Sequence, residues 1–531
     1  LLGWLAAGAV LCGPGPARAL EFKVDGYDRL RYRWLRDESI RPVGKSAARS
    51  SETDFLDHRL LLNPTLKITD AVTIKAQLRI FDNVITDSTD SVTPFIVPSD
   101  PDTFRTPIDD VDREGEPIED FQVERIWAEV MTPVGRFDFG RQSSQWGMGV
   151  LANAGNNLEW LWEGQGDDFG STVDRIRFTT RLGEQGPYLV PIYDRIVERG
   201  NVGGLQLADN LDPTAATLGG IDTGSDDVHE FVVALYYPYG GAEDDFEAAG
   251  GVYLVYRTQD GSDGDAFIED IYGKVRYKGL TLSTELVWVQ AQATVVDRTP
   301  TTGGDIDIRA QQWAGVARLD LEGDLGGMDA GLRFEAGWAS GPATDEFRAP
   351  IEGGNVALLG DKLDQFAFWS PDYDVDIILF DEILGRVSNA TYLKGVAHLA
   401  PAKNWNSYVA VIWSRAFQPL TVVDRHDVRV SNFFNEDDPD APDPEVGIPF
   451  RRFYSREGER DYGIEFDAGV SWQPLANLKM EIKGAVFLPG KVFNNTLTGA
   501  TLSGPLGIDQ PVKFRDGDPI YAISSQIAVM F

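Results

Sequence analysis

One stretch decides the fold of this chain: Ile520-Tyr521-Ala522-Ile523-Ser524-Ser525-Gln526-Ile527-Ala528-Val529-Met530-Phe531. Counted back from Phe531 in steps of two, the residues are apolar or aromatic except for Ser525, whereas the other parity holds mainly small and polar residues, with Met530 as an exception. A period of two is that of a β-strand with one apolar face and one mixed face. We therefore expect a strand here, belonging either to a soluble sheet or to a membrane barrel.

The same alternation recurs from one end of the chain to the other. Apolar side chains occupy one parity and charged or polar side chains the other in the segments 22–34, 60–67, 72–80, 271–277, 462–472 and 478–486. In a soluble β-sandwich the two faces would be core and surface, and in a barrel they would face lipid and lumen. Alternation alone does not separate these two architectures.

The connections between the alternating segments separate them. Tight turns are expected at 69–70, 132–135, 183–186, 239–245, 278–279, 322–327, 400–402 and 473–476. Between them lie long polar stretches at 37–53, 84–118, 143–171, 198–226, 295–305, 342–385, 418–460 and 490–517, and a shorter one at 259–264. Short turns on one rim and long loops on the other are the layout of a transmembrane barrel.

The sequence therefore predicts an all-β fold: a single antiparallel transmembrane β-barrel with short periplasmic turns and long extracellular loops. Counting the turns gives about 18 strands, an even number that places both termini on the short-turn side. The count falls to about 16 if the proline-containing segment 187–197 and one other weak strand are loops, since proline disfavours central strands.

Composition limits the compartment and the partners. The chain has 531 residues and a net charge of −35, which excludes a nucleic-acid partner. Its single cysteine, Cys12, lies in an apolar leader that ends in Ala17-Arg18-Ala19. We expect residues 1–19 to be a cleaved secretory signal peptide and residues 20–531 to form the barrel. A lipoprotein signal centred on Cys12 is the alternative, although Leu11 stands where a small residue is expected.

Two local motifs resemble bacterial outer-membrane porins. An alternating last strand ending in Phe531 resembles the C-terminal assembly signal of these barrels, and Gly140-Arg141-Gln142 before the loop at 143–171 resembles the point where a porin's third external loop folds inward. Leu30-Arg31-Tyr32-Arg33 is also similar to alginate-export barrels. The resemblance to alginate-export barrels implies an arginine-lined lumen that passes an acidic polysaccharide. The resemblance of the last strand to porins implies an assembly signal formed by Tyr521, Ile523, Ile527, Val529 and Phe531.

Basic side chains concentrate in the predicted strands. Rings of arginine and lysine inside a barrel select anions. The predicted pore-lining residues are Arg29, Arg31, Arg33, Arg59, Lys75, Arg79, Arg125, Arg141, Arg175, Arg177, Arg181, Lys274 and Arg276. The alternative is that inward charges of both signs merely solvate a water-filled lumen, with the arginines paired to Asp25, Glu124, Glu129, Asp270 and Glu285.

The loop at 143–171 is the third long one and carries polar and aromatic residues. If it folds into the barrel, these side chains narrow the pore opposite the basic wall. The predicted constriction residues are Asn156, Glu159, Trp160, Glu163, Asp167 and Asp168. The alternative is that the tryptophans of this loop belong to the membrane interface.

No catalytic or metal motif stands out. The four histidines, His58, His229, His398 and His426, lie outside any serine-hydrolase or zinc-protease motif, and the acidic run at 435–440 lacks the spacing of a calcium loop. We therefore expect neither an enzyme nor a cofactor.

The function predicted from the sequence is an outer-membrane channel for small polar, chiefly anionic, solutes or an anionic polysaccharide. Its expected partners are outer-membrane lipid, lipopolysaccharide and the barrel-assembly machinery, which would act through the C-terminal strand. The alternative is a structural or adhesive barrel with a plugged lumen and acidic loops that bind ions or partners.

Overall fold

The computed structural model describes most of the predicted strands and parts of the connections between them. The described residues are 20–36, 52–87, 121–155, 170–196, 228–241, 244–259, 264–296, 305–341, 351–352, 355–356, 362–363, 368–419, 434–435, 438–442, 459–493, 501–503, 509–511 and 519–531. The predicted signal peptide, residues 1–19, lies outside them.

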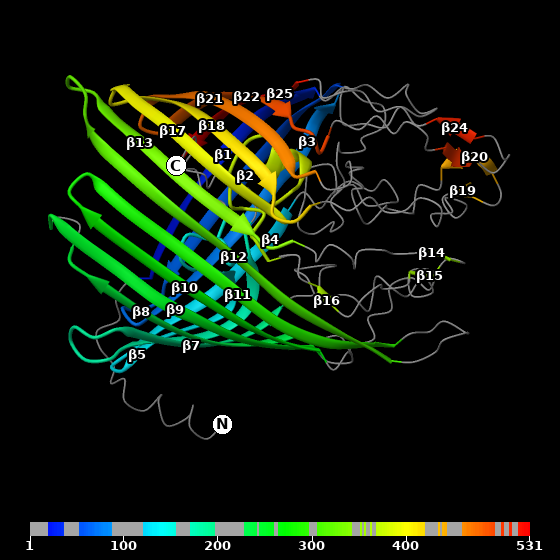
Figure 1. The fold of residues 1–531 in the computed structure, drawn as a ribbon. Coiled ribbons are helices and arrows are strands. Elements are labelled where there is room, and N and C mark those ends of the chain that lie inside the picture. The colour runs from blue at the N-terminus through cyan, green and yellow to red at the C-terminus, as the bar shows by residue number, and fades with distance from the viewer. Residues whose placement is uncertain are drawn as a thin grey trace.

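Eighteen antiparallel strands form a closed barrel, as the sequence predicts (Figure 1). Each strand pairs with the next one in the chain, and β1 also pairs with β25 from Tyr27–Met530 to Arg36–Tyr521, which closes the sheet. The strands are β1 (Glu21–Arg36), β2 (Glu52–Lys67), β3 (Val72–Asp87), β4 (Phe121–Thr132), β5 (Gly135–Ser143), β6 (Thr172–Arg181), β7 (Tyr188–Ile196), β8 (Val228–Tyr239), β9 (Phe246–Gln259), β10 (Gly264–Tyr277), β11 (Leu280–Val296), β12 (Asp305–Asp324), β13 (Asp329–Ala339), β17 (Ala390–Ala402), β18 (Trp405–Ala416), β21 (Asp461–Leu475), β22 (Leu478–Pro489) and β25 (Ile520–Met530).

The remaining elements are short and lie in the connections. They are β14 (Ile351–Glu352), β15 (Asn355–Val356), β16 (Lys362–Leu363), which pairs in parallel with β12, η2 (Leu379–Ile383), β19 (Phe434–Asn435), β20 (Asp438–Pro442), β23 (Thr501–Ser503) and β24 (Asp509–Pro511). In the described part of the chain, no helix is both long and apolar enough to cross a membrane.

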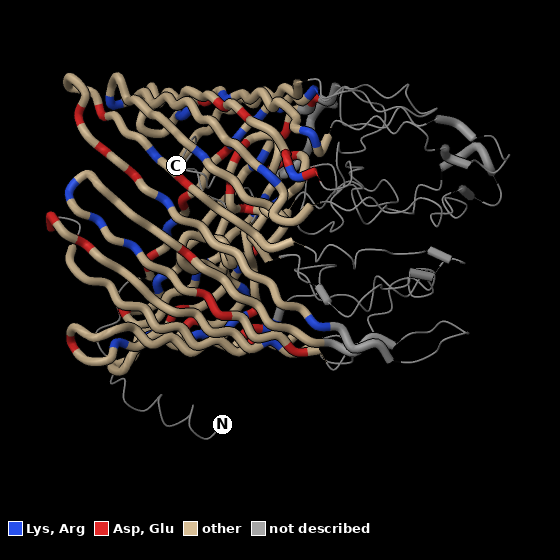
Figure 2. The backbone as a smooth tube through the Cα atoms, viewed as in Figure 1, with Lys and Arg blue, Asp and Glu red and all other residues tan. Residues whose placement is uncertain are grey.

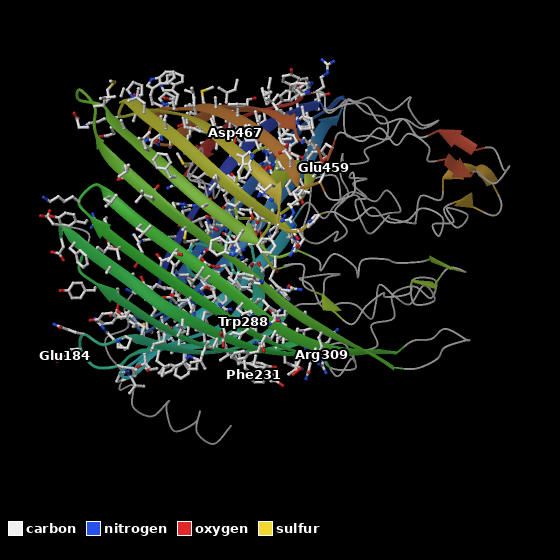
Figure 3. All side chains as sticks on the ribbon, in the orientation of Figure 1. Glu184, Phe231, Trp288, Arg309, Glu459 and Asp467 are labelled. Atoms are coloured by element: carbon white, nitrogen blue, oxygen red, sulfur yellow. The ribbon has the colours of Figure 1, made fainter. Side chains whose placement is uncertain are left out.

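The structure confirms that short turns lie at one rim of the barrel and that long connections start from the other. All of the predicted short turns join neighbouring strands at one rim of the barrel, where Glu184 lies, and the long connections start from the other rim, marked by Arg309 and Glu459 (Figure 3). The C-terminus and the first strand's start lie at the short-turn rim, because Tyr27 pairs with Met530 while Glu21 pairs with Lys67 before the β2–β3 turn.

The outer face of the barrel is apolar because of the alternation seen in the sequence. On β8, Phe231 and Val233 are 51% and 48% exposed, whereas the alternate residues Glu230 and Val232 are buried. Aromatic side chains form two exposed bands. One is near the short turns, at Tyr237, Tyr239, Phe246, Tyr277, Trp405, Trp472 and Phe531, and the other toward the loop rim, at Phe231, Tyr256, Phe267, Trp288, Trp313, Trp413 and Tyr521. An apolar band between aromatic girdles is the surface of a barrel that spans a membrane.

Two irregularities adapt strands to the barrel. The segment with Pro191 is a strand, β7, so the lower count of about 16 strands is wrong. Its register with β8 is continuous, whereas pairing with β6 skips residues 190–191, where proline has no N–H to donate. On β4 a register shift opposite Gln77 and Leu78 brings the side chains of Glu124 and Arg125 both to the buried side.

Candidate functional site: the barrel lumen

One side of the lumen carries a column of arginines on β1 and β2. Arg29 and Arg31 share the inward parity with Tyr27, and both are almost fully buried. Asp57 of β2, which is fully buried, accepts from Arg31 at 2.9 Å and from Arg29 at 3.3 Å. Two guanidinium groups of neighbouring inward positions therefore bind the same carboxylate.

Further ion pairs continue along the inner wall from β3 to β13, and Figure 2 shows charges of both signs along the barrel strands. Arg175 donates to both oxygens of Asp194, at 2.7 and 2.6 Å, and neither side chain is exposed. Other pairs on the described inner wall are Lys75–Glu129, Arg79–Glu124, Arg136–Asp138, Arg177–Asp138, Arg257–Glu230, Lys274–Glu247, Arg276–Glu247, Arg318–Glu335 and Arg333–Asp320. The inner wall is thus laced by ion pairs, which is the arrangement that the sequence left open as an alternative to unpaired basic rings.

The structure brings most of the predicted pore-lining residues to the inner face. Arg59, Arg79, Arg125 and Arg175 are buried there, and Arg33 approaches Glu382 at 3.8 Å. Arg181 shares the inward parity but lies at the short-turn rim, where it donates to the carbonyl of Gly186. Arg141 instead shares the parity of the exposed Phe137 and Phe139 and pairs with Asp174 at 2.9 Å, so it does not belong to the inward set.

The side of the lumen formed by β8–β13 and β17–β18 carries a buried apolar cluster beside ion pairs such as Arg257–Glu230 and Arg318–Glu335. Its inward residues include Val232, Ala234, Tyr253, Val255, Ile268, Val287, Val289, Val316, Tyr392, Ala410 and Ile412, all buried. Within a barrel whose lumen was filled by water, these side chains would be exposed. They are buried because two chain segments fold into the barrel and pack against them.

The first inward segment comprises residues 144–155, the start of the loop that was predicted to enter the barrel. Trp146 packs on Tyr253 of β9 with ring centroids 5.1 Å apart, and Met148 and Val150 are buried beside it. Glu285 of β11 accepts hydrogen bonds from the backbone N–H groups of Met148, Val150 and Leu151. This part of the loop therefore enters the lumen, whereas Asn156, Glu159, Trp160, Glu163, Asp167 and Asp168 lie outside the described residues.

The second inward segment comprises residues 368–388, of which the sequence analysis placed residues 368–385 in the external loop at 342–385. It includes η2, whose Leu379, Phe380 and Ile383 are buried. Glu465 of β21 accepts from the N–H groups of Ile377, Ile378 and Leu379. The apolar run Ile377-Ile378-Leu379-Phe380 is the sequence signal for this burial, because such a run is out of place in a solvated loop.

The two inward segments touch each other. The N–H of Ser370 donates to the carbonyl of Val150 at 2.7 Å. Asn153 donates through Nδ2 to the carbonyl of Asp372 at 2.9 Å, and the N–H of Gly170 donates to Oδ1 of Asp372 at 3.0 Å. Segments from two different loops therefore form one packed body against the apolar wall.

Two predicted arginine partners have another role. Asp270 and Glu285 interact with each other on neighbouring strands, and Glu285 holds the first inward segment. Glu124 and Glu129 do pair with basic residues, as considered from the sequence, and Asp25 accepts from Asn63. The carboxylates that bind backbone N–H groups carry no sequence motif, because their partners come from loops more than eighty residues away.

Two histidines of the described residues, His58 and His229, form hydrogen bonds with neighbouring side chains. His58 pairs with Asp28 on the outward parity, and His229 accepts or donates a bond with Tyr193 at 2.8 Å. Among the residues the structure describes, no group of three or more His, Cys, Asp or Glu side chains could hold a metal ion. His426 and part of the acidic run at 435–440 lie outside them.

No protein-family model matches the chain, and no curated protein matches it. Solved structures similar to it over almost the whole length include OccAB3 of Acinetobacter baumannii (10% identity, 96% of this chain and 100% of that one, TM-score 0.46) and OccK9 (OpdG) of Pseudomonas aeruginosa (11%, 96% and 99%, TM-score 0.46). A BenF-like porin from Pseudomonas fluorescens Pf-5 is similar at 8% identity, over 96% and 98%, with a TM-score of 0.46. Likeness at this level concerns fold and carries no information about solutes.

Proposed function

We propose that this barrel is a channel of the bacterial outer membrane through which small anionic solutes diffuse. The observation that carries the proposal is the arginine column of β1, in which Arg29 and Arg31 both bind the buried carboxylate of Asp57. The net charge of the whole chain is −35, so the clustering of arginines on β1 is a local feature and does not follow from composition.

The mechanism is diffusion along a charged wall. A basic wall enclosed by low-dielectric protein focuses the electric field and raises the local concentration of anions. The two inward segments cover the apolar cluster of the lumen, so the solute path is expected beside the wall formed by β1–β6. Arg29 and Arg31 are almost fully buried in this wall, so they would act on the solute through their field and not by direct contact. Ion pairs such as Arg175–Asp194 fix the guanidinium groups in place but also neutralise them, so they shape the wall without adding net positive charge.

Planar-bilayer recording tests the proposal directly. The refolded protein is inserted into a bilayer with different KCl concentrations on the two sides, and the reversal potential reports charge selectivity. Discrete steps with an anion-selective reversal potential support the proposal, and Arg31→Gln is then expected to reduce anion selectivity. Cation-selective steps overturn the anionic substrate class but leave a channel.

The second candidate is a structural or adhesive barrel with a plugged lumen. The observation that favours it is the packed body of the two inward segments, whose core includes Trp369, Ile378 and Ile383, all nearly or fully buried. Absence of conductance from correctly folded protein would support this candidate. An anionic polysaccharide as substrate would instead be indicated by transient current blockades when an oligouronate is added to a conducting barrel.

The proposed location implies further steps that belong to the same proposal. Residues 1–19 would be removed on export, and the C-terminal strand with Tyr521, Ile523, Ile527, Val529 and Phe531 would engage the assembly machinery. Its outward parity supports this role, since Tyr521, Ile523 and Val529 are exposed on the membrane face. Lipopolysaccharide would contact the outer surface near the loop rim.

A further inference from the structure

Glu285 and Glu465 bind the two inward segments in the same way. In each case one carboxylate oxygen accepts two backbone N–H groups and the other oxygen accepts one. Oε1 of Glu285 accepts from Val150 and Leu151 while Oε2 accepts from Met148. Oε1 of Glu465 accepts from Ile377 and Ile378, at 2.9 and 2.8 Å, while Oε2 accepts from Leu379 at 3.0 Å.

We propose that Glu285 and Glu465 are positioning residues that fix the two inward segments inside the barrel as one body. Neither residue was predicted from the sequence to hold a loop, and the inference goes beyond the proposed function because it applies equally to a conducting and to a plugged barrel. The two glutamates lie on β11 and β21, so the body is held from two separate parts of the wall.

The chemistry explains why a glutamate is required at each place. A carboxylate has lone pairs for several donors and carries the charge that strengthens hydrogen bonds to backbone N–H groups. Both carboxylates are buried, with Glu285 at 0% and Glu465 at 1% exposure, so the N–H groups would otherwise be buried without an acceptor. A glutamine of the same shape offers one oxygen and turns an NH₂ donor toward the remaining N–H.

The first inward segment is shaped to receive its glutamate. Gly147 has φ +53°, a conformation that side-chain-bearing residues rarely adopt, and a Cβ added there would overlap the Glu285 carboxylate. Trp146 of the segment packs on Tyr253 of β9, with ring centroids 5.1 Å apart. The carboxylate, the glycine and the tryptophan therefore fit together as one binding arrangement.

The contact between the segments makes the body continuous. Ser370 donates to the carbonyl of Val150, the residue whose N–H is bound by Glu285. Loosening Val150 therefore removes the acceptor that holds the start of the second inward segment. The second segment has additional contacts with the wall, at Phe368 under Arg257 and at Tyr373, which accepts from Arg318 at 3.0 Å.

Hydrogen–deuterium exchange of the refolded full chain in detergent, read by mass spectrometry, tests this. Glu285→Gln is expected to increase amide exchange about tenfold or more in residues 146–152, since charge-assisted hydrogen bonds are lost. A smaller increase is expected at 369–373 through the Val150–Ser370 contact. Glu465→Gln is expected to produce the same increase at 376–384.

The matched control is Glu247→Gln. Glu247 is an inward carboxylate of β9 that pairs with Arg276 and Lys274 and not with either segment. It should leave exchange in both segments unchanged, and each variant's folding is checked by heat-modifiable migration on gels. If either Glu285→Gln or Glu465→Gln fails to fold, the other variant still tests the positioning role.

Each outcome has one meaning. The positioning role is overturned if folded Glu285→Gln and Glu465→Gln show the same amide exchange as the parent chain in residues 146–152 and 376–384, respectively. An increase at 146–152 with none at 369–373 in Glu285→Gln overturns the claim of one body. Exchange does not depend on conductance, so a barrel that passes no current still yields a result, and failure of the proposed function is distinguishable from failure of this inference.

Discussion

Arg33 of β1 and Glu382 of the second inward segment form an ion pair with a distance of 3.8 Å between Nη1 and Oε1. The pair links the arginine column to the body that fills the apolar side of the lumen. Both side chains are about one-quarter exposed, at 26% and 28%. Removing either charge therefore changes the electrostatics of a solvated region without leaving a fully buried charge unpaired.

Glu382→Gln is expected to make the channel more anion-selective, and Arg33→Gln less so. The first variant removes one negative charge from the lumen and the second removes one positive charge, so their reversal potentials in a KCl gradient should shift in opposite directions. Asp70→Asn is the control, because Asp70 pairs with Lys67 at an exposed short turn. A shift of the same sign in both lumen variants would contradict the assignment of Arg33 to the conducting path.

Asp57→Asn is expected to destabilise the barrel strongly. Asp57 is fully buried and binds both Arg29 and Arg31, so the variant removes a buried negative charge that two nearby buried guanidinium groups use. Breaking such a buried pair costs about 3–5 kcal/mol. Denaturant unfolding in detergent measures the change. Arg141→Gln, which breaks a pair whose side chains are 29% and 42% exposed, is the comparison and should cost under about 1 kcal/mol. Equal losses of stability in Asp57→Asn and Arg141→Gln would contradict the role of Asp57 as a buried partner of both arginines.

The alternation of the strands was predictable because every strand touches lipid on one face, which imposes a period of two on the sequence. All of the short turns and the strand number followed from it. Arg141 departs from the expected parity. It lies on β5, which starts at Gly135, and Phe137 and Phe139 are exposed on the outer face of this strand. Arg141 is two residues after Phe139 and therefore shares the outward parity. Pro191 was ambiguous because only the pairing partner decides whether a missing N–H matters.

The inward segments were only partly predictable. Entry of the 143–171 loop followed from its resemblance to porins, but the partners of Glu285 and Glu465 are long-range backbone groups, which leave no local pattern. The apolar run from Ile377 to Phe380 was the one available signal for the second segment. A run of four apolar residues in a connection indicates burial, just as alternation indicates a strand with one face on lipid.

Phe531 offers a way to separate the side chain's role from that of the backbone. Its N–H donates to Gly26 at 3.1 Å and its carbonyl accepts from Gly26 at 3.0 Å, at the seam where β1 meets β25. Phe531→Ala keeps both bonds, so it should fold in vitro with the parental yield and stability. A chain ending at Met530 loses both, which is expected to cost about 2 kcal/mol at about 1 kcal/mol for each bond.

In cells the two variants should behave alike if the aromatic side chain is an assembly signal. Both are then expected to reach the outer membrane in reduced amount, measured by heat-modifiable migration of membrane fractions. Parental amounts of Phe531→Ala in the membrane would contradict the role of the Phe531 side chain in assembly.

Asp381 of the second inward segment gives that segment a pH dependence. Burial, with Glu382 and Asp374 nearby, raises the pKa of Asp381 to about 7, against the opposing effects of Arg33 and Lys483. When the segment opens, the pKa returns to the ordinary value of about 3.9. The open form therefore releases the proton first, and packing of the segment weakens as pH rises from about 4 to about 7, then stays constant.

Amide exchange of residues 380–384, corrected for the intrinsic rise of exchange with pH, measures this change. Protection should fall between pH 5 and 8 in the parent chain. Asp381→Asn removes the titrating group, so its protection should be independent of pH across that range and exceed the parental value at pH 8. Glu247→Gln, at a distant ion pair of the wall, should retain the parental profile. A parental pH profile in Asp381→Asn would assign the dependence to another group, such as Asp376, whose Oδ1 accepts from the N–H groups of Phe380 and Asp381.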